Sequence, residues 1–168
     1  MYYFELFDIP VSLNVNKSAL MKKYYQLSKE FHPDHFSLQS AESQEKALKT
    51  STDINEAKKI LDNPYKRLEY ILKEKNIIEP DEKYTLPPAF LGEMMDINEQ
   101  LMELEFEPNE ELTTSIKESL RLQEEQVYNS VSKYFDMEEL QCNEEGFQLL
   151  KDFYYKRKYL QRIQEKIS

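Results

Sequence analysis

Three consecutive residues, His32, Pro33 and Asp34, could hold an imidazole and a carboxylate close together at one fixed place. They follow an amphipathic helical pattern over residues 16–31. Pro33 cannot continue that helix, lacks a backbone donor and biases the preceding residue away from helical angles. Asp34 can accept hydrogen bonds from nearby backbone N–H groups, as turn-forming aspartates do. The tripeptide therefore predicts a fixed, exposed loop beside a helix.

Two other interpretations of this loop remain open from the tripeptide alone. Prolines commonly follow the ends of helices, so the first of these interpretations is a turn without function. A divalent metal site on His32, Asp34 and His35 is the other. Three ligands within a four-residue loop rarely give good geometry, and the chain has no other histidine. With no Ser/His/Asp set and no glycine-rich phosphate loop, the sequence predicts that the protein is not an enzyme and needs no cofactor.

The composition predicts an all-α protein. Of 168 residues 40% are hydrophobic, only two are glycine, and good helix formers dominate. Cys142 is the only cysteine, so one chain can form neither an internal disulfide nor a thiolate-bound metal or iron–sulfur site. We expect this cysteine to be a bystander.

The charge is unevenly divided along the chain. Residues 1–76 carry 12 Lys and Arg against 11 Asp and Glu (+1), and residues 77–168 carry 10 against 21 (−11), which gives the total of −10. The acidic half argues against nucleic acid and anionic membrane as partners, since both favour clustered Lys and Arg. No apolar run reaches the length of a bilayer span, and the N-terminus lacks the features of a signal peptide. We expect a cytoplasmic protein.

The period of the apolar residues, together with capping and helix-breaking residues, predicts seven helices. The expected ranges are 3–7, 16–31 capped by Asn16, 41–62, 64–72, 88–106, 109–135 capped by Asn109, and a last helix that starts within 137–147 and ends at 167. The expected buried side chains include Leu20, Leu27, Leu48, Ile54, Leu61, Leu149, Phe153 and Ile163. Residues 76–88, with Pro80 and Pro87-Pro88, read as a linker, and the last three helices as a small antiparallel bundle.

The helix over 88–106 carries more apolar surface than one core requires. Phe90, Met94, Ile97, Leu101 and Leu104 form one stripe, and Leu91, Met95 and Met102 form a second, edged by carboxylates that include Asp96 and Glu99. Such a second stripe is typical of a binding face, and methionine suits it because its side chain adapts in shape. The alternative is that the second stripe packs against another part of the chain.

Beyond the tripeptide, the first 75 residues resemble a J-domain in the order of their segments. The matching segments are Tyr2–Phe7, the run Lys22–Asp34 that contains KKYYQLSKEFHPD, and the run Ile54–Pro64, INEAKKILDNP. The following YKRLEYIL and Ala89-Phe90-Leu91, and the absence of a Gly/Phe-rich segment, resemble the HscB family.

This resemblance implies a J-domain helical hairpin with flanking short helices over 1–75, a linker over 76–88 and a three-helix scaffold-binding domain over 89–168. It implies a co-chaperone that binds an IscU-type iron–sulfur scaffold protein and stimulates ATP hydrolysis by a DnaK/HscA-type chaperone, promoting cluster transfer and maturation of iron–sulfur proteins. The chaperone-binding residues would be His32, Pro33, Asp34, Lys22, Lys23 and Lys29. The scaffold-binding residues would be Leu91, Gly92, Met95, Asp96, Glu99 and Phe153.

Two positions depart from the pattern of that family. His35 stands where a lysine is common, and Gly92 stands where a larger apolar side chain is usual. The remaining alternatives are a J-protein adaptor that delivers a different folded client to such a chaperone, and a purely structural helical protein.

Overall fold

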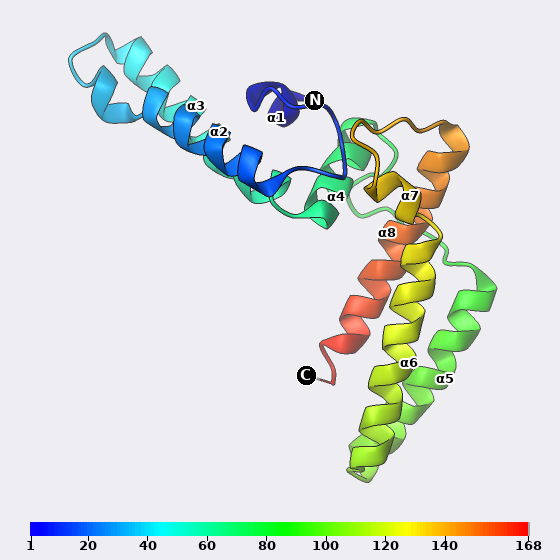
Figure 1. Ribbon diagram of the computed structural model, residues 1–168. Helices are drawn as coiled ribbons and strands as arrows, with labels where there is room; N and C mark the ends of the chain where they lie inside the picture. The colour runs from blue at the N-terminus through cyan, green and yellow to red at the C-terminus, as the bar shows by residue number, and fades with distance from the viewer. Residues whose placement is uncertain (168) are drawn as a thin grey trace. The chain divides into compact units, whose positions relative to one another are not determined.

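The computed structural model describes residues 1–167, and its regular elements there are helices, with no strand (Figure 1). The all-α prediction is confirmed. The chain divides into two compact units, Met1–Asn76 with Tyr134–Gln141, and Ile77–Lys133 with Cys142–Ser168. The segment Tyr134–Gln141, which the sequence analysis places in the C-terminal domain, therefore belongs to the first unit. None of the helices within residues 1–167 combines the length and apolar character that a bilayer crossing needs.

The first unit is built around one long helix, α3, which packs against each of its neighbours. The elements are α1 (Tyr2–Leu6), α2 (Lys17–Glu30), the 3₁₀ turn η1 (Pro33–Phe36), α3 (Ala41–Leu61) and α4 (Pro64–Glu74). Helices α2 and α3 form a hairpin with η1 in the turn between them (Figure 1). The buried side chains include Phe4, Phe7, Leu20, Leu27, Ile54, Ala57, Leu61, Leu68, Ile71 and Leu72.

Asparagine side chains cap the N-termini of two of these helices. The Asn16 side chain accepts a hydrogen bond from the Ala19 N–H at 3.0 Å, and that of Asn63 accepts from Tyr65 and Lys66. Each such bond satisfies a backbone donor that the first helical turn leaves without a partner. The predicted cap at Asn16 is confirmed.

One predicted core position of α3 is wrong. Leu48 is 59% exposed, whereas Ala47, Ile54, Ala57 and Leu61 are buried. The buried set recurs at intervals of seven, three and four residues, which is the period of one helix face. Leu48 lies about 100° round the helix from Ala47 and falls outside this face.

A buried arginine fixes the loop that leads into α2. The Arg67 guanidinium donates to the carbonyl oxygens of Leu61, at the end of α3, and of Leu13, in the loop. The same loop is bound from the other side, because the Leu140 N–H donates to the Val11 oxygen at 2.7 Å. The start of α2 is thereby held by contacts from residues far apart in the sequence.

The second unit contains a bundle in which α6 packs against both α5 and α8 (Figure 1). The helices of the bundle are α5 (Pro88–Phe106), α6 (Glu110–Asn129) and α8 (Glu144–Gln164). The short α7 (Ser132–Phe135) follows α6 and runs into the segment that belongs to the first unit. Asn109 caps α6 as predicted, accepting from the backbone N–H of Glu111 and Leu112. The core contains Phe90, Met94, Ile97, Leu101, Ile116, Leu120, Val127, Leu150, Phe153, Leu160 and Ile163.

Two expectations for this unit are wrong. The predicted helix over 109–135 is interrupted, because the Ser130 hydroxyl donates to the Val127 carbonyl and the Ser132 hydroxyl to that of Asn129. Such local bonds compete with the helical ladder, and α6 ends at Asn129. Leu149, expected inside, is 40% exposed, since Leu150 occupies the buried position.

Candidate functional site: two interaction surfaces

The loop at His32-Pro33-Asp34 is closed by its own hydrogen bonds. His32 has the extended backbone (φ −66°, ψ 128°) that a following proline favours. Its Nδ1 accepts from the Asp34 N–H at 3.3 Å and lies 3.6 Å from Asp34 Oδ2, while the His35 N–H donates to the His32 oxygen. Because Nδ1 accepts, the proton of the neutral ring lies on Nε2.

This loop presents its side chains to solvent. The side chain of His32 is 55% exposed and that of Asp34 is 88% exposed. Between residues 1 and 167 no three His, Cys, Asp or Glu side chains are grouped so that they could hold a metal ion. Neither His32, Asp34 and His35 nor any other such set therefore supports the metal alternative.

The three predicted lysines of α2 differ in their surroundings. Lys22 and Lys29 are exposed, whereas the Lys23 side chain is only 28% exposed and its Nζ lies 3.7 Å from Asp8 Oδ2. Lys23 therefore stands apart from Lys22 and Lys29, which share one face of α2.

The exposed face of α2 includes an aromatic residue that the sequence analysis did not select. Tyr25 is 65% exposed and follows Lys22 by three residues and precedes Lys29 by four. Those intervals place the three side chains on one side of the helix. The signal was present in the sequence, since Tyr25 falls outside the buried stripe of Leu20 and Leu27.

The second candidate surface is the face of α5 that does not enter the core. Met95 is 62% exposed and Met102 60%, while Leu91 is half-buried. The two methionines therefore do not pack within the second unit. Gly92, Asp96 and Glu99 are also exposed, and a Cβ at Gly92 would meet nothing within 4 Å.

Phe153 does not belong to this exposed face. It is 3% exposed in α8, and its ring makes an edge contact with Tyr128, with ring centroids 6.4 Å apart. The helical period had also predicted an inward position for this residue. Its assignment to a scaffold-binding surface is not supported, because a core side chain cannot contact a partner without rearrangement.

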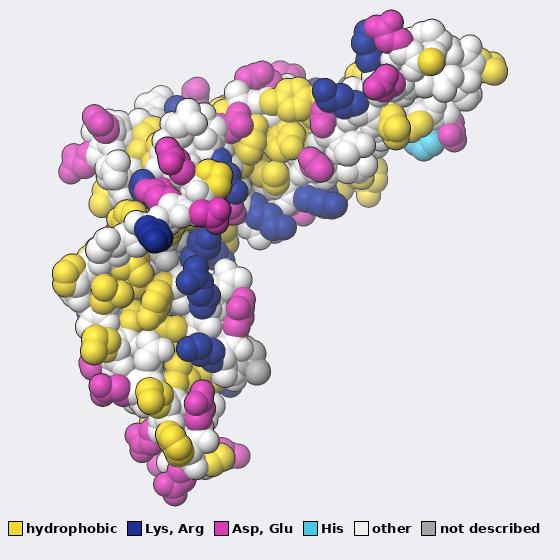
Figure 2. Space-filling model, turned by 180° about the vertical axis from the view of Figure 1, so that it is seen from behind, with side chains coloured by type: hydrophobic (Ala, Val, Ile, Leu, Met, Phe, Trp, Pro, Cys, Tyr) yellow, Lys and Arg dark blue, Asp and Glu magenta, His cyan; other side chains and the backbone are white. Residues whose placement is uncertain are grey.

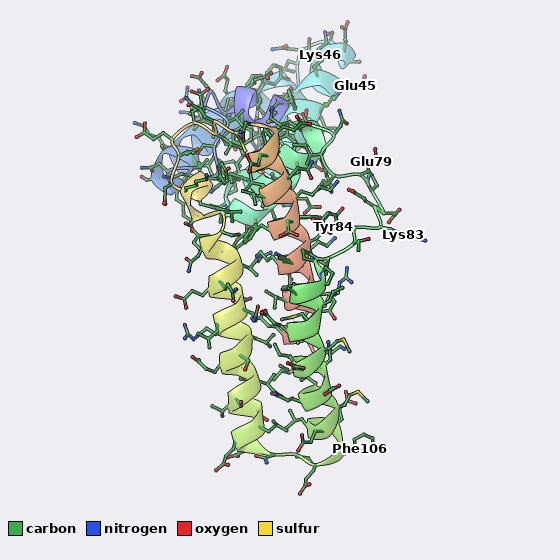
Figure 3. All side chains as sticks on the ribbon, turned by 90° about the vertical axis from the view of Figure 1, so that its right-hand side faces the viewer. Glu45, Lys46, Glu79, Lys83, Tyr84 and Phe106 are labelled. Atoms are coloured by element: carbon green, nitrogen blue, oxygen red, sulfur yellow. The ribbon has the colours of Figure 1, made fainter. Side chains whose placement is uncertain are left out.

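The segment predicted as a linker is fastened to α8. The Tyr84 and Tyr155 rings are stacked with their centroids 4.5 Å apart, and the Tyr84 hydroxyl donates to Asp152 at 3.1 Å. Figure 3 labels Tyr84, which lies beside α8. Lys151 forms an ion pair with Glu82 at 2.5 Å and donates to the Ile77 oxygen at 2.8 Å. These contacts hold the chain just before α5 and so position the start of that helix.

This fastening changes the acidity of the groups that form it. Burial, with a smaller effect of the bond to Asp152, raises the pKa of Tyr84 to about 12. Burial also raises the pKa of Tyr155 to about 12, helped by its hydrogen bond to Glu82. The hydrogen bond from Lys151 lowers the pKa of the Glu82 carboxyl. The cluster therefore favours the neutral phenols of Tyr84 and Tyr155 and the charged carboxylate of Glu82.

Two family models match the two parts of the chain. A model described as "DnaJ domain" matches residues 3–70, and one described as "HSCB C-terminal oligomerisation domain" matches residues 86–168. A co-chaperone protein HscB homolog of Vibrio vulnificus (strain YJ016) is 35% identical over 105 residues, which is 62% of this chain. That match covers 61% of the length of the Vibrio protein.

The human protein is similar over nearly the whole chain. The iron-sulfur cluster co-chaperone protein HscB of Homo sapiens is 32% identical over 167 residues, which cover 99% of this chain and 67% of the human protein. The crystal structure of human co-chaperone protein HscB matches with a TM-score of 0.76, covering 99% of this chain and 80% of that one. The chain belongs to the HscB family of J-domain co-chaperones.

Proposed function

We propose that this protein binds an IscU-type iron–sulfur scaffold protein and stimulates ATP hydrolysis by a DnaK/HscA-type chaperone. Cluster transfer and maturation of iron–sulfur proteins would follow from that coupling. The chaperone would be bound within residues 1–75 and the scaffold within 89–168, with 76–88 between them. The hydrolysis belongs to the chaperone, and this protein acts by binding alone.

The observation that carries the proposal is the loop His32-Pro33-Asp34, closed on itself and open to solvent. A loop already fixed in one conformation loses little entropy when a partner binds it. Lys22 and Lys29 add two exposed positive charges on the helix that leads into the loop. Such charges favour fast, salt-sensitive association with an acidic surface. We therefore propose an acidic site on the chaperone as the partner of this face.

The scaffold half of the proposal rests on the exposed face of α5. Met95 and Leu91 offer apolar area, and Asp96 and Glu99 offer charges at its edge. An apolar centre with a charged rim is the usual arrangement of a protein interface. A Cβ at Gly92 would meet open space, so Gly92→Leu should enlarge the apolar area of this face.

Binding of each partner to the full chain tests the two halves separately. Asp34→Asn should abolish binding to the chaperone and leave scaffold binding intact. Met95→Ala should weaken scaffold binding roughly tenfold, as loss of a central apolar contact typically does, and leave chaperone binding intact.

Matched variants control for general surface effects. Lys66→Ala in α4 removes another exposed lysine of the first unit, and Leu122→Ala removes another exposed apolar side chain, from α6. Neither should change binding. A protein that binds the chaperone but ignores the scaffold would instead be an adaptor for a different client.

A further inference from the structure

The far end of α5 carries an exposed aromatic ring. Phe106, the last residue of the helix, is 87% exposed, and no other phenylalanine within residues 1–167 is exposed to a comparable degree. Its side chain points away from α6 at the end of the bundle (Figure 3). Met102, one turn earlier, is 60% exposed. Two neighbouring large apolar side chains, Met102 and Phe106, are thus exposed to solvent at this end of α5.

These two residues continue the exposed face of α5. Leu91, Met95, Met102 and Phe106 follow one another at intervals of four, seven and four residues. At about 100° per residue all four lie within about 60° of one another around the helix axis. At about 1.5 Å per residue, the 15 steps from Leu91 to Phe106 extend the face over about 22 Å.

The charges around the far end are all of one sign. Between Lys83 and Lys117 the sequence has eight Asp and Glu and no Lys or Arg, and six of the glutamates fall within residues 99–111. None of these carboxylates forms an ion pair among the described residues. Figure 2 shows acidic side chains gathered around apolar ones at this end of the unit.

Part of this charge is unfavourable for the helix that carries it. Glu103 and Glu105 lie in the last turn of α5, where no basic residue accompanies them. Carboxylates at a helix C-terminus oppose the helix dipole, whereas Lys and Arg would complement it. No ion pair within residues 1–167 offsets the charges of Glu103 and Glu105, and a positively charged partner would.

We propose that Phe106 and Met102, with Glu103, Glu105 and Glu107 around them, form a second anchor for the scaffold protein. This inference rests on the proposed function. The anchor takes a basic segment of the scaffold, in which Lys or Arg side chains flank an apolar one. A second copy of this chain is disfavoured as the occupant, because two such ends would bring like charges together.

The test is the affinity of the full-length protein for an IscU-type scaffold protein at low and moderate salt. Phe106→Ala should weaken binding roughly tenfold, as truncation of an aromatic anchor typically does. The triple variant Glu103→Gln, Glu105→Gln, Glu107→Gln should weaken binding at low salt and flatten its salt dependence. Leu122→Ala, which removes a half-exposed apolar side chain from α6, should leave the affinity unchanged.

The outcomes separate this inference from the proposed function. Full affinity of Phe106→Ala, together with weak binding by Met95→Ala, overturns the second anchor and leaves the proposed function standing. Absence of scaffold binding by the wild type overturns both. Sedimentation gives an independent result, since a dimer that disappears in Phe106→Ala would mean that a second copy covers this end and would overturn the scaffold assignment.

Discussion

At the buried Arg67, we expect a substitution that keeps the positive charge to be more destabilising than one that removes it. Its side chain is 4% exposed, and its two donors bind the carbonyl oxygens of Leu61 and Leu13. We predict that Arg67→Lys destabilises the first unit more than Arg67→Met does. Lysine keeps the positive charge but lacks the planar fork that reaches both oxygens.

The magnitudes follow from opposing contributions. Hydrogen bonds from a charged donor contribute about 1.5–3 kcal/mol each, so loss of both costs about 3–6 kcal/mol. Burial lowers the pKa of Arg67 to about 10, which corresponds to about 3 kcal/mol against the charged form. Methionine loses both bonds but also removes the penalty, so its net cost is about 0–3 kcal/mol. Lysine keeps the penalty, and because its single ammonium does not reproduce the fork both bonds are lost, so its cost is about 3–6 kcal/mol.

Hydrogen exchange followed by mass spectrometry measures this effect unit by unit. Peptides from α3 and α4 should lose protection in both variants, more in Arg67→Lys, while peptides from α6 stay unchanged. Arg121→Met is the matched control, because this exposed arginine pairs with Glu118 and Glu125 on its own helix. Equal or greater protection in Arg67→Lys than in Arg67→Met would refute the reasoning.

Three further predictions concern the second unit. Tyr84 and Tyr155 should ionise near pH 12 in an ultraviolet titration. Because the fold favours their neutral phenols, their contribution to the free energy of unfolding is complete below about pH 10 and is lost as the pH rises to 12. A wild type in which no phenol ionises near pH 12 would contradict it. Gly92→Ala should stabilise α5 by up to about 1 kcal/mol in urea, since its Cβ meets open space; destabilisation would be the contrary result. Asn109→Ala should cost about 1 kcal/mol through loss of the α6 cap, against no change for Asn129→Ala.

Local rules were sufficient where a helix is bounded by residues of special geometry. The predicted helix 88–106 agrees with α5 at both ends, since Pro87-Pro88 and Pro108 delimit it. The loop after α2 likewise follows from Pro33 and its neighbours. Such residues act through their own backbone, so their effect can be read without knowledge of the tertiary structure.

Features that depend on contacts between distant residues could not be predicted. Lys23 pairs with Asp8, 15 positions earlier, and the linker is held because Tyr84 stacks on Tyr155, 71 positions later. Neither pair has a local signal in the sequence. The break at Ser130 is a different case, because serine hydroxyls bind helix carbonyls in some helices without ending them.

The central claim is that the exposed loop and the α5 face couple scaffold binding to ATP hydrolysis by a chaperone. Single-turnover hydrolysis by a cognate DnaK/HscA-type chaperone tests it most directly, with and without this protein and an IscU-type scaffold. Wild type should accelerate hydrolysis, and more so with the scaffold; Asp34→Asn should lose all acceleration, and Leu91→Ala/Met95→Ala only the added effect of the scaffold. Acceleration by Asp34→Asn equal to that of wild type would contradict the claim.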